Sequence, residues 1–421
     1  MILSHKDYAP VAEYTADVVV VGTGAGGGAV GTELAEAGAH VVFVEEGSYT
    51  PTESFNPYTS QSIPRLYRDA AATVIFGNPP IPYVEGRAVG GSTVINGGMA
   101  YRAPERVLDE WAQSMGAPEL GPRGMDSVYE RVERAVSVAH QHPKSVGEDS
   151  RIMQRGAEKM GWSYTVNQRN QAACVGANNC ALGCPTGAKQ STLVSYLPRA
   201  FRAGADCLTD VRVERLLIRG GRAVGIEGRS VDPITRRPGH KVVVRARAVI
   251  VSCGAVQTPL LLQRHRLGRP SGLLGKNFLC HPNAKVLAIY PHDVMGWQGV
   301  SQNTQIRHFH EDGILMAENF VAPGVIAAYL PFHGARAFEI MQRFNQMVLS
   351  GVLVEDSSTG SVRRGPLGLP LVRYDIQPLD HRRFLRGVKL LAEMHFNMGA
   401  EEVLLPFFNQ PSAKSMDDLK Q

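Results

Sequence analysis

The feature that most constrains the fold is a glycine-rich turn that joins a strand to a helix near the N-terminus. Val18–Val21 is an unbroken β-branched run, as expected for a strand buried on both faces of a parallel sheet. Gly22, Gly24 and Gly27 follow directly, and the apolar residues after them recur at helical spacing. A second apolar strand at 41–44 completes the pattern, which predicts a βαβ unit with a parallel sheet.

The same turn predicts a dinucleotide site. Gly22 permits the tight turn, Gly24 lets a pyrophosphate approach the backbone, and Gly27 lets the helix pack on the strand. The helix N-terminus offers free N–H groups and a partial positive charge to the phosphates. Glu45 ends the next strand, at about the 20-residue offset expected for a ribose ligand, and favours an unphosphorylated ribose, as in FAD or NAD. A glycine turn of purely structural origin is the alternative.

A second glycine motif distinguishes between these two cofactors. The segment Gly86–Met99 contains a Gly-Gly-Ser loop, which gives the backbone a second place to touch a long cofactor. FAD is longer than NAD and has more need of such a loop. The motif therefore favours FAD, with a NAD-dependent oxidoreductase as the competing interpretation.

Taken together, these motifs resemble the glucose–methanol–choline (GMC) family of flavoprotein oxidoreductases. The resemblance covers nearly the whole chain. Its further landmarks are Glu45-Glu46-Gly47, Arg222–Glu227, Val249–Leu261 and Gly275–His281.

The resemblance implies an FAD cofactor and a set of residues that bind it. By this resemblance Val213 covers the adenine, and Gly254 lies in the turn of the family's signature strand. The residues that would lie along the ribityl chain and the flavin ring are Gly90, Gly91, Ser92, Asn96, Gly97 and Met99.

The expected fold is α/β with two domains. Residues 1–285 are predicted to form a Rossmann-like FAD-binding domain, a parallel sheet with an inserted β-meander. This part includes an irregular excursion at 51–86 and a cysteine-containing segment at 172–192. Residues 286–421 are predicted to form an α+β substrate domain with an antiparallel sheet, incomplete at its C-terminal end.

Local patterns place further elements along the chain. They predict a hairpin and two further strands, of which Ala248–Ser252 is apolar enough to rejoin the parallel sheet. Gly399 is a natural stop for the last helix. The expected ranges are helices at 104–116, 126–140 and 380–398, a hairpin at 211–229, and two strands within 241–252.

The resemblance implies oxidation of an alcohol CH–OH group by hydride transfer to the flavin. The family's catalytic histidine belongs to a motif of the form HxxGTxRMG, which is not found in the chain. No catalytic residue is therefore named, and the chain is expected to be a fragment or one piece of a split enzyme. A flavin-binding protein without catalysis is the alternative. The histidines without a partner pattern are His308, His310, His333, His381 and His395, and His281 belongs to a family motif with a largely structural role.

Three cysteines form a further candidate site. Cys174, Cys180 and Cys184 are closely spaced, and the last precedes a proline, which suits an iron–sulfur cluster. The pattern resembles the motif of bacterial flavoprotein glucose dehydrogenases, which carry a [3Fe–4S] cluster and pass electrons to a cytochrome. It also resembles a segment of long-chain fatty alcohol oxidases, in which no cluster is expected. Free buried thiols remain the alternative.

The composition of the chain limits which binding partners and which cellular compartment are expected. The net charge is +5 without a Lys/Arg run, which indicates a solvated surface and no nucleic-acid partner. No stretch of eighteen apolar residues or signal peptide is found, so the expectation is a cytoplasmic protein without a transmembrane segment. The partners expected are a small-molecule alcohol and an electron acceptor that is oxygen, a quinone or a cytochrome.

Overall fold

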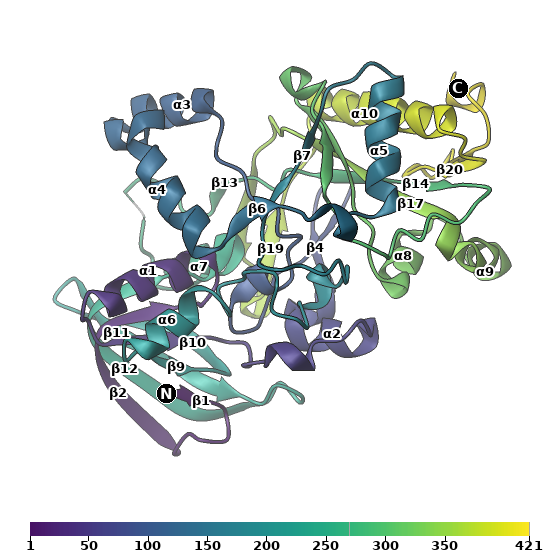
Figure 1. The fold of residues 1–421 in the computed structure, drawn as a ribbon. Helices are drawn as coiled ribbons and strands as arrows, with labels where there is room; N and C mark the ends of the chain where they lie inside the picture. The colour runs from purple at the N-terminus through teal and green to yellow at the C-terminus, as the bar shows by residue number, and fades with distance from the viewer. Residues whose placement is uncertain (269, 421) are drawn as a thin grey trace.

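A computed structural model describes residues 1–268 and 270–420 and folds them around two large β-sheets. Figure 1 shows the two sheets in separate parts of the molecule, the first built from purple and teal strands and the second mainly from green and yellow ones. Among the described residues, no helix combines the length and the apolar character needed to cross a membrane.

The first sheet is mainly parallel. Its first five strands run parallel to one another, and the last two form an antiparallel meander with the fifth. This arrangement confirms the predicted Rossmann-like sheet with an inserted meander, and the predicted hairpin at 211–229 is its outer edge. The order across the sheet is β1 (Ile2–Leu3), β9 (Asp206–Leu208), β3 (Val41–Val44), β2 (Val11–Val21), β12 (Pro238–Val251), β11 (Arg222–Val231) and β10 (Val211–Arg219).

The long strand β12 joins the parallel sheet to the meander. Its last residues, Ala248–Val251, pair in parallel with Val18–Val21, which confirms that this segment rejoins the parallel sheet. Its first residues pair with β2 on one side and with β11 on the other. The prediction of two separate strands within 241–252 was therefore wrong, because one strand continues through the whole segment.

Both faces of the parallel strands are covered, which explains the unbroken apolar run. Val18 and Val20 pack on the side of α1 (Ala25–Glu36) and α6 (Tyr196–Arg202). Val19 and Val21 face the other side, toward the meander and α7 (Gly254–Arg264). With apolar partners on both sides, no position of this strand needs a polar residue.

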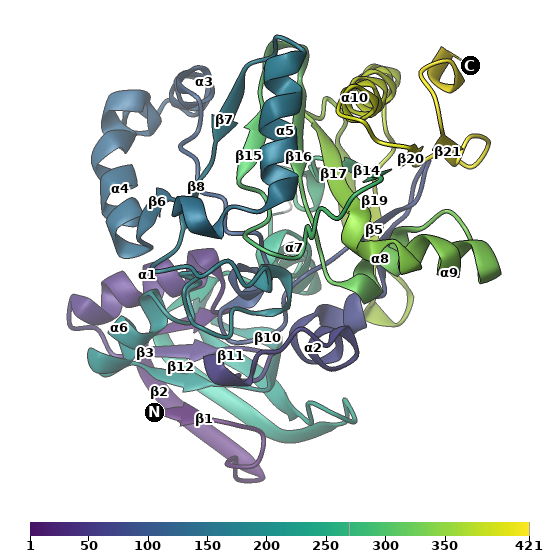
Figure 2. The ribbon, with the colours of Figure 1, turned by 45° about the vertical axis from the view of Figure 1, so that its right-hand side comes forward.

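The second sheet is antiparallel throughout. Helices α5 (Glu148–Lys159) and α10 (Pro378–Asn397) cover one face, and α8 (Pro323–Tyr329) and α9 (Gly334–Gln342) cover part of the other (Figure 2). One strand, β7, comes from residues before 285, and the division into domains at 285 stays a prediction. The order is β21 (Ser412–Ala413), β20 (Glu402–Leu404), β14 (Asn283–Ile289), β17 (Met347–Val354), β16 (Ile314–Glu318), β15 (Thr304–Ile306) and β7 (Tyr164–Val166).

Smaller elements connect the two sheets. The excursion at 51–86 holds helix α2 (Thr59–Leu66) and a hairpin of β4 (Thr73–Ile75) and β5 (Ile81–Tyr83). The predicted helix at 126–140 is wrong beyond Ala135, because Ser137 is left-handed at φ +52° and a short strand follows. The other elements are α3 (Glu105–Met115), α4 (Pro122–Ala135), a pair of β6 (Val138–His140) and β8 (Gln168–Asn170), and a sheet of β13 (Lys276–Phe278), β18 (Gly360–Arg364) and β19 (Pro370–Arg373).

Candidate cofactor site

The glycine turn between β2 and α1 contains two glycines that the chain itself requires and one that it does not. A Cβ added to Gly22, which is at φ +99°, would lie 2.4 Å from the carbonyl oxygen of Ser252. One added to Gly27 would lie 2.0 Å from the carbonyl oxygen of Gly22. A Cβ on Gly24 would have no described atom nearer than 3.9 Å, so the space beside Gly24 is open to a ligand. No side chain caps α1 at this end, which leaves its N-terminal N–H groups to an anion.

The Gly-Gly-Ser loop packs directly on this turn. The backbone N–H of Gly90 donates to Thr23 Oγ1 over 2.9 Å, and a Cβ on Gly91 would lie 2.8 Å from Gly24 Cα. Ser92 Oγ accepts from the N–H of Gly86 over 2.9 Å, which closes the loop on itself. The structure therefore brings together the two glycine motifs that the sequence places some 65 residues apart.

Glu45 braces the same turn from the end of β3. Its carboxylate accepts hydrogen bonds from the N–H of Thr23 (3.0 Å), from Thr23 Oγ1 (2.7 Å) and from the N–H of Gly47 (2.9 Å). Burial raises the pKa of this carboxyl group, and the three hydrogen bonds oppose that rise. A carboxylate has about four acceptor sites, so one of them is available to a ribose hydroxyl, and that contact stays a prediction.

A third segment, which the sequence analysis singled out only for its cysteines, clamps the two loops together. Thr192 Oγ1 lies within hydrogen-bonding distance of the carbonyl oxygens of Thr23 (2.9 Å) and Gly90 (3.2 Å), which share its one hydrogen. The ammonium group of Lys189 donates to three carbonyl oxygens, those of Val94 (2.7 Å), Asn96 (2.8 Å) and Cys180 (2.7 Å). Neither role has a local sequence signal, because all of these contacts except that of Lys189 with Cys180 span some 90 to 170 positions of the chain.

The segment from Asn96 to Met99 leads from this site toward the antiparallel sheet. Arg169 holds it by donating to the carbonyl oxygens of Gly97 and, over 2.6 Å, of Ser301. A Cβ on Gly97 would lie 1.5 Å from Gln302 Oε1, so a side chain at this place would have to displace the Gln302 amide. Asn167 Nδ2 lies 3.4 Å from the sulfur of Met99. The loop is thus fixed to the residues that precede strand β15.

Arg87 is a further residue that the sequence analysis did not single out. Its side chain is buried, and among the described residues its Nε atom has no hydrogen-bond partner. Buried charges in proteins are normally paired, so an unpaired guanidinium next to the Gly-Gly-Ser loop suits the negative charge of a pyrophosphate. The open space beside Gly24, the uncapped helix and this arginine together fit a dinucleotide cofactor such as FAD.

Two predicted residues lie at the ends of neighbouring elements. Val213 is in β10, two positions after Val211, whose N–H donates to the carbonyl oxygen of Glu45 over 2.9 Å. Gly254 begins α7 at φ +79°, and a Cβ there would meet no atom within 4 Å. Both residues are therefore next to segments that form the candidate site, while their contacts with a cofactor stay predictions.

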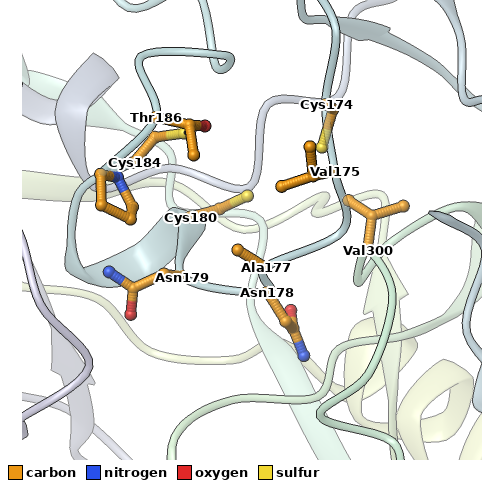
Figure 3. A pocket seen from close by; sticks show the side chains of 10 residues that line it. Cys174, Val175, Ala177, Asn178, Asn179, Cys180, Cys184, Thr186 and Val300 are labelled. Atoms are coloured by element: carbon orange, nitrogen blue, oxygen red, sulfur yellow. The ribbon is translucent and has the colours of Figure 1, made fainter.

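The three cysteines line one small pocket, shown in Figure 3. Its volume is about 10 Å³, roughly enough for a single water molecule. Burial raises the pKa of the Cys184 thiol, but hydrogen bonds from the N–H of Lys189 and from Thr186 outweigh it, so the net pKa is lowered. In residues 1–268 and 270–420, no group of three His, Cys, Asp or Glu side chains is arranged to hold a metal ion. The geometry therefore gives the [3Fe–4S] cluster no support.

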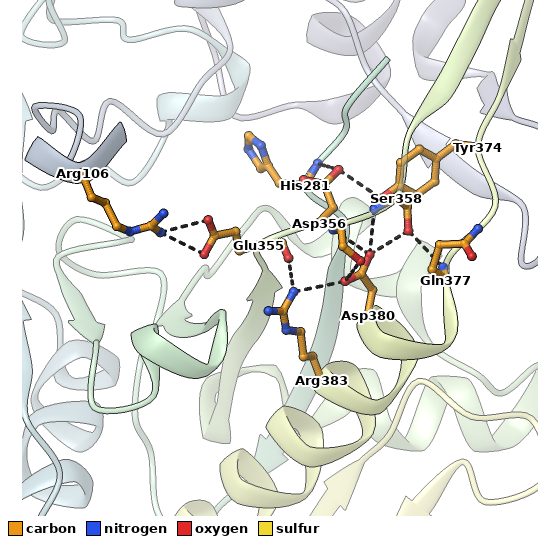
Figure 4. A network of polar contacts seen from close by, with 10 residues as sticks. Arg106, His281, Glu355, Asp356, Ser358, Tyr374, Gln377, Asp380 and Arg383 are labelled. Atoms are coloured by element: carbon orange, nitrogen blue, oxygen red, sulfur yellow. Dashed lines mark hydrogen bonds and ion pairs between the residues drawn. The ribbon is translucent and has the colours of Figure 1, made fainter. Parts of the chain in front are cut away.

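The histidines do not form a catalytic group in the described part of the chain. The backbone N–H of His281 donates to Asp356 Oδ2 over 3.2 Å, and its ring takes part in none of the contacts drawn in Figure 4. Ser358 and Tyr374 complete that network, which fixes the start of α10. His395 is fully buried between Tyr290 and Ser350, and burial lowers its pKa to about 3. These contacts are structural, and no catalytic residue emerges from them.

Comparison of the chain with known proteins identifies its relatives. The sequence signature of the GMC oxidoreductases matches residues 22–283. An uncharacterised GMC-type oxidoreductase of Mycobacterium tuberculosis is 35% identical over 407 residues, which are 96% of this chain and 63% of that protein. A long-chain-alcohol oxidase of Arabidopsis thaliana is 27% identical over 92% of this chain and 53% of its own length. The chain thus spans less than two thirds of these relatives.

Solved structures of the same fold agree with this result. Pyridoxine 4-oxidase from Mesorbium loti has a TM-score of 0.67 at 18% identity and covers 96% of this chain and 85% of its own. A formate oxidase from Aspergillus oryzae has a TM-score of 0.69 at 15% identity, with 97% and 86% covered. At these identities the likeness shows the fold alone, whereas the sequence signature over residues 22–283 shows the family. The chain belongs to the GMC oxidoreductase family of flavoproteins.

Proposed function

We propose that this chain binds FAD at the junction of the two glycine loops and takes part in the oxidation of an alcohol. The observation that carries the proposal is the contrast within the glycine turn. The chain has no internal need for glycine at position 24, since a Cβ there would meet only Gly91 Cα at 3.9 Å. A pyrophosphate that binds against the backbone at this position would require glycine there.

The residues around this opening have distinct roles in holding the cofactor. Gly24 and Gly91 give the backbone room, the N-terminus of α1 and Arg87 supply positive charge, and Glu45 offers an acceptor to the ribose. When bound, the flavin would supply the acceptor for a hydride from the alcohol carbon. Lys189 and Arg169 keep the loop from Val94 to Met99 in place, toward the antiparallel sheet. A long-chain-alcohol oxidase among the relatives supports an alcohol as the substrate class.

The cofactor can be tested with two glycine variants of the same turn. We expect Gly24→Val to fold like the wild type and to lose FAD, because its side chain would fill the place of the pyrophosphate. Gly26→Ala is the matched control, because its Cβ would lie 3.6 Å from Ser252 Oγ, an ordinary contact. The measurements are thermal unfolding, the identity of the nucleotide released on denaturation, and the FAD dissociation constant from flavin fluorescence. Release of NAD without FAD, or tight FAD binding by Gly24→Val, would contradict the proposal.

The reaction is tested on FAD-loaded protein without oxygen. Short-chain, long-chain, sugar and sterol alcohols are added in turn, and the absorbance of oxidised flavin is followed. Bleaching by at least one alcohol is expected. If FAD binds tightly and none of the alcohols bleaches it, the chain binds flavin without this catalysis.

A further inference from the structure

The cysteine pocket brings three free thiols together, those of Cys174, Cys180 and Cys184 (Figure 3). The chain reverses between the last two. A short 3₁₀ turn begins at Cys180, and Gly183 follows it at φ +87°. The side-chain amide of Asn179 donates to the carbonyl oxygen of Gly183 over 2.7 Å, which fixes this turn. The turn therefore holds Cys180 and Cys184 against one small space.

Cys184 has the surroundings of a reactive thiolate. Its Sγ atom accepts from the backbone N–H of Lys189 and lies beside Thr186 Oγ1, each over 3.4 Å. Such contacts stabilise the thiolate, which is the form of cysteine that attacks an oxidant, and the pKa of Cys184 is lowered in spite of burial. By contrast, burial raises the pKa of the thiols outside the pocket, which are Cys207, Cys253 and Cys280.

Cys180 contacts both cations that hold the loop from Val94 to Met99. Arg169 Nη2 lies 3.6 Å from Cys180 Sγ, and the same nitrogen donates to the carbonyl oxygen of Gly97. The ammonium group of Lys189 donates to the carbonyl oxygen of Cys180 over 2.7 Å and also to two carbonyl oxygens of the loop. A chemical change at Cys180 therefore acts directly on the side chains that keep this loop in place.

The size of the pocket selects a small reagent. Its volume of about 10 Å³ is roughly that needed by one water molecule. Hydrogen peroxide is little larger than water, whereas a bulky disulfide such as oxidised glutathione does not fit between the thiols. A peroxide is therefore the oxidant that suits this site.

We propose that Cys184 and Cys180 form a peroxide-sensitive pair of thiols, and that their disulfide loosens the loop from Val94 to Met99. The modification is a property of the chain alone. Its effect on FAD rests on the proposed function, which places this loop against the flavin.

The chemistry proceeds in two steps. The Cys184 thiolate attacks one peroxide oxygen, an S–O bond forms as the O–O bond breaks, and the released hydroxide takes a proton from solvent to become water. Two electrons pass from the sulfur to the peroxide. The Cys180 thiol then attacks the Cys184 sulfur, an S–S bond forms as the S–O bond breaks, and the hydroxyl leaves with the Cys180 proton as a second water. The Cys180 sulfur is then bonded to Cys184, and Arg169 loses its contact with the thiol.

Peptide mapping after peroxide treatment tests the pair. Reduced protein, with and without FAD, is treated with hydrogen peroxide, the remaining thiols are alkylated, and the peptides are identified by mass. We expect a disulfide between Cys180 and Cys184 that dithiothreitol reverses. Cys184→Ser should abolish it. Cys174→Ser, at the third thiol of the same pocket, is the matched control and should keep it.

The FAD dissociation constant, measured by flavin fluorescence after the peroxide is removed, tests the coupling to the loop. In the oxidised wild type it should rise about threefold or more, as expected for the loss of one hydrogen bond. The same treatment should leave it unchanged in Cys184→Ser. If that variant fails to fold, the comparison of oxidised with re-reduced wild type gives the same answer.

The outcomes separate this inference from the proposed function. If peroxide leaves Cys180 and Cys184 unpaired, or the disulfide includes Cys174, the assignment of the pair is overturned. Iron held by these thiols in protein prepared without oxygen would also overturn it, because they would then be ligands. An unchanged FAD dissociation constant in the oxidised protein would overturn the coupling alone. If FAD does not bind at all, the proposed function fails, and the mapping of the FAD-free protein still decides whether the two thiols pair.

Discussion

Two buried lysines, one in each half of the molecule, have opposite surroundings. Burial lowers the pKa of both, to about 8 in each case. The ammonium group of Lys189 donates to three backbone carbonyl oxygens in the candidate cofactor site. That of Lys285, on the antiparallel sheet, has no partner in the described chain. The first lysine is saturated by hydrogen bonds to the protein, and the second has none among the described residues.

Two buried carboxylates, Glu45 and Glu318, differ in the same way in how far the protein satisfies them. In Glu45, beside the glycine turn, both oxygens accept hydrogen bonds from the protein. In Glu318, on β16, one oxygen accepts from Ser150 (2.5 Å) and from two backbone N–H groups, whereas Oε2 has no partner in the part of the chain that the structure describes. Its neighbour Asp149 is also buried with one oxygen unpaired. The Glu45 carboxylate and the Lys189 ammonium group are therefore satisfied by the protein, whereas Glu318 and Asp149 each keep one oxygen without a partner among the described residues.

The largest loss of stability is expected when Lys189 is replaced. In Lys189→Met the side chain keeps its approximate length but loses all three donors. The buried carbonyl oxygen of Val94 and the partly buried ones of Asn96 and Cys180 then lose this partner. Unfolding in urea should show a loss on the order of 3 kcal/mol, since each unmet buried acceptor costs about 1–3 kcal/mol. The FAD affinity should fall as well, because the segment from Val94 to Asn96 is no longer held. A loss below about 1 kcal/mol would contradict the role of Lys189 as a clamp.

The contrast also shows which parts of the site the sequence could reveal. The glycine turn and the Gly-Gly-Ser loop were predictable because each is a local pattern with a backbone reason. Lys189 and Arg169 were not, because the carbonyl oxygens by which they hold the loop are distant in sequence: Lys189 reaches Val94 across 95 positions, and Arg169 reaches Ser301 across 132. No pattern within either segment indicates which backbone oxygens will lie beside it.

The fold follows the same division between local and long-range signals. The parallel strands were predictable from apolar runs such as Val18–Val21, and α10 from its helical period and the stop at Gly399, which is at φ +90°. The end of α4 was not, since the left-handed residue that follows it is Ser137 and not a glycine. The contribution of β7 to the antiparallel sheet depends on pairing with β15, far along the chain, and has no local signal.

A second prediction concerns the pH dependence of stability and Glu318. Burial raises the pKa of this carboxyl group from 4.5 to about 7, and Asp149 beside it is also raised, first by burial and then by the charge of Glu318. A raised folded-state pKa means that this contribution to stability is complete below pH 4.5 and is lost as the pH rises through 7. The slope between these limits is at most about 1.4 kcal/mol per pH unit for one proton.

Glu318→Gln tests this slope, because glutamine cannot ionise. The free energy of unfolding, measured from pH 4.5 to 8, should fall less steeply in Glu318→Gln than in the wild type. The charged or ionisable groups in this environment include Asp149, Arg169 and Arg307, and the phenol of Tyr101, whose pKa burial raises to about 12, stays neutral. All of them remain in the variant. An equal slope in both proteins would show that Glu318 is already ionised in the folded state. It would then contribute nothing to the pH dependence of stability.

The smallest effect is expected at Lys285. In Lys285→Met an unpaired, partly buried charge is replaced by an apolar side chain of similar shape, so stability at pH 7 should change by less than about 1 kcal/mol, or rise. The lysine penalty is present below pH 8 and disappears as the pH rises to 10.5, where the amine is neutral in both the folded and the unfolded state. Any advantage of Lys285→Met should therefore vanish over that range. A loss as large as that in Lys189→Met would mean that Lys285 has a protein partner after all, and the two lysines would then share one structural role.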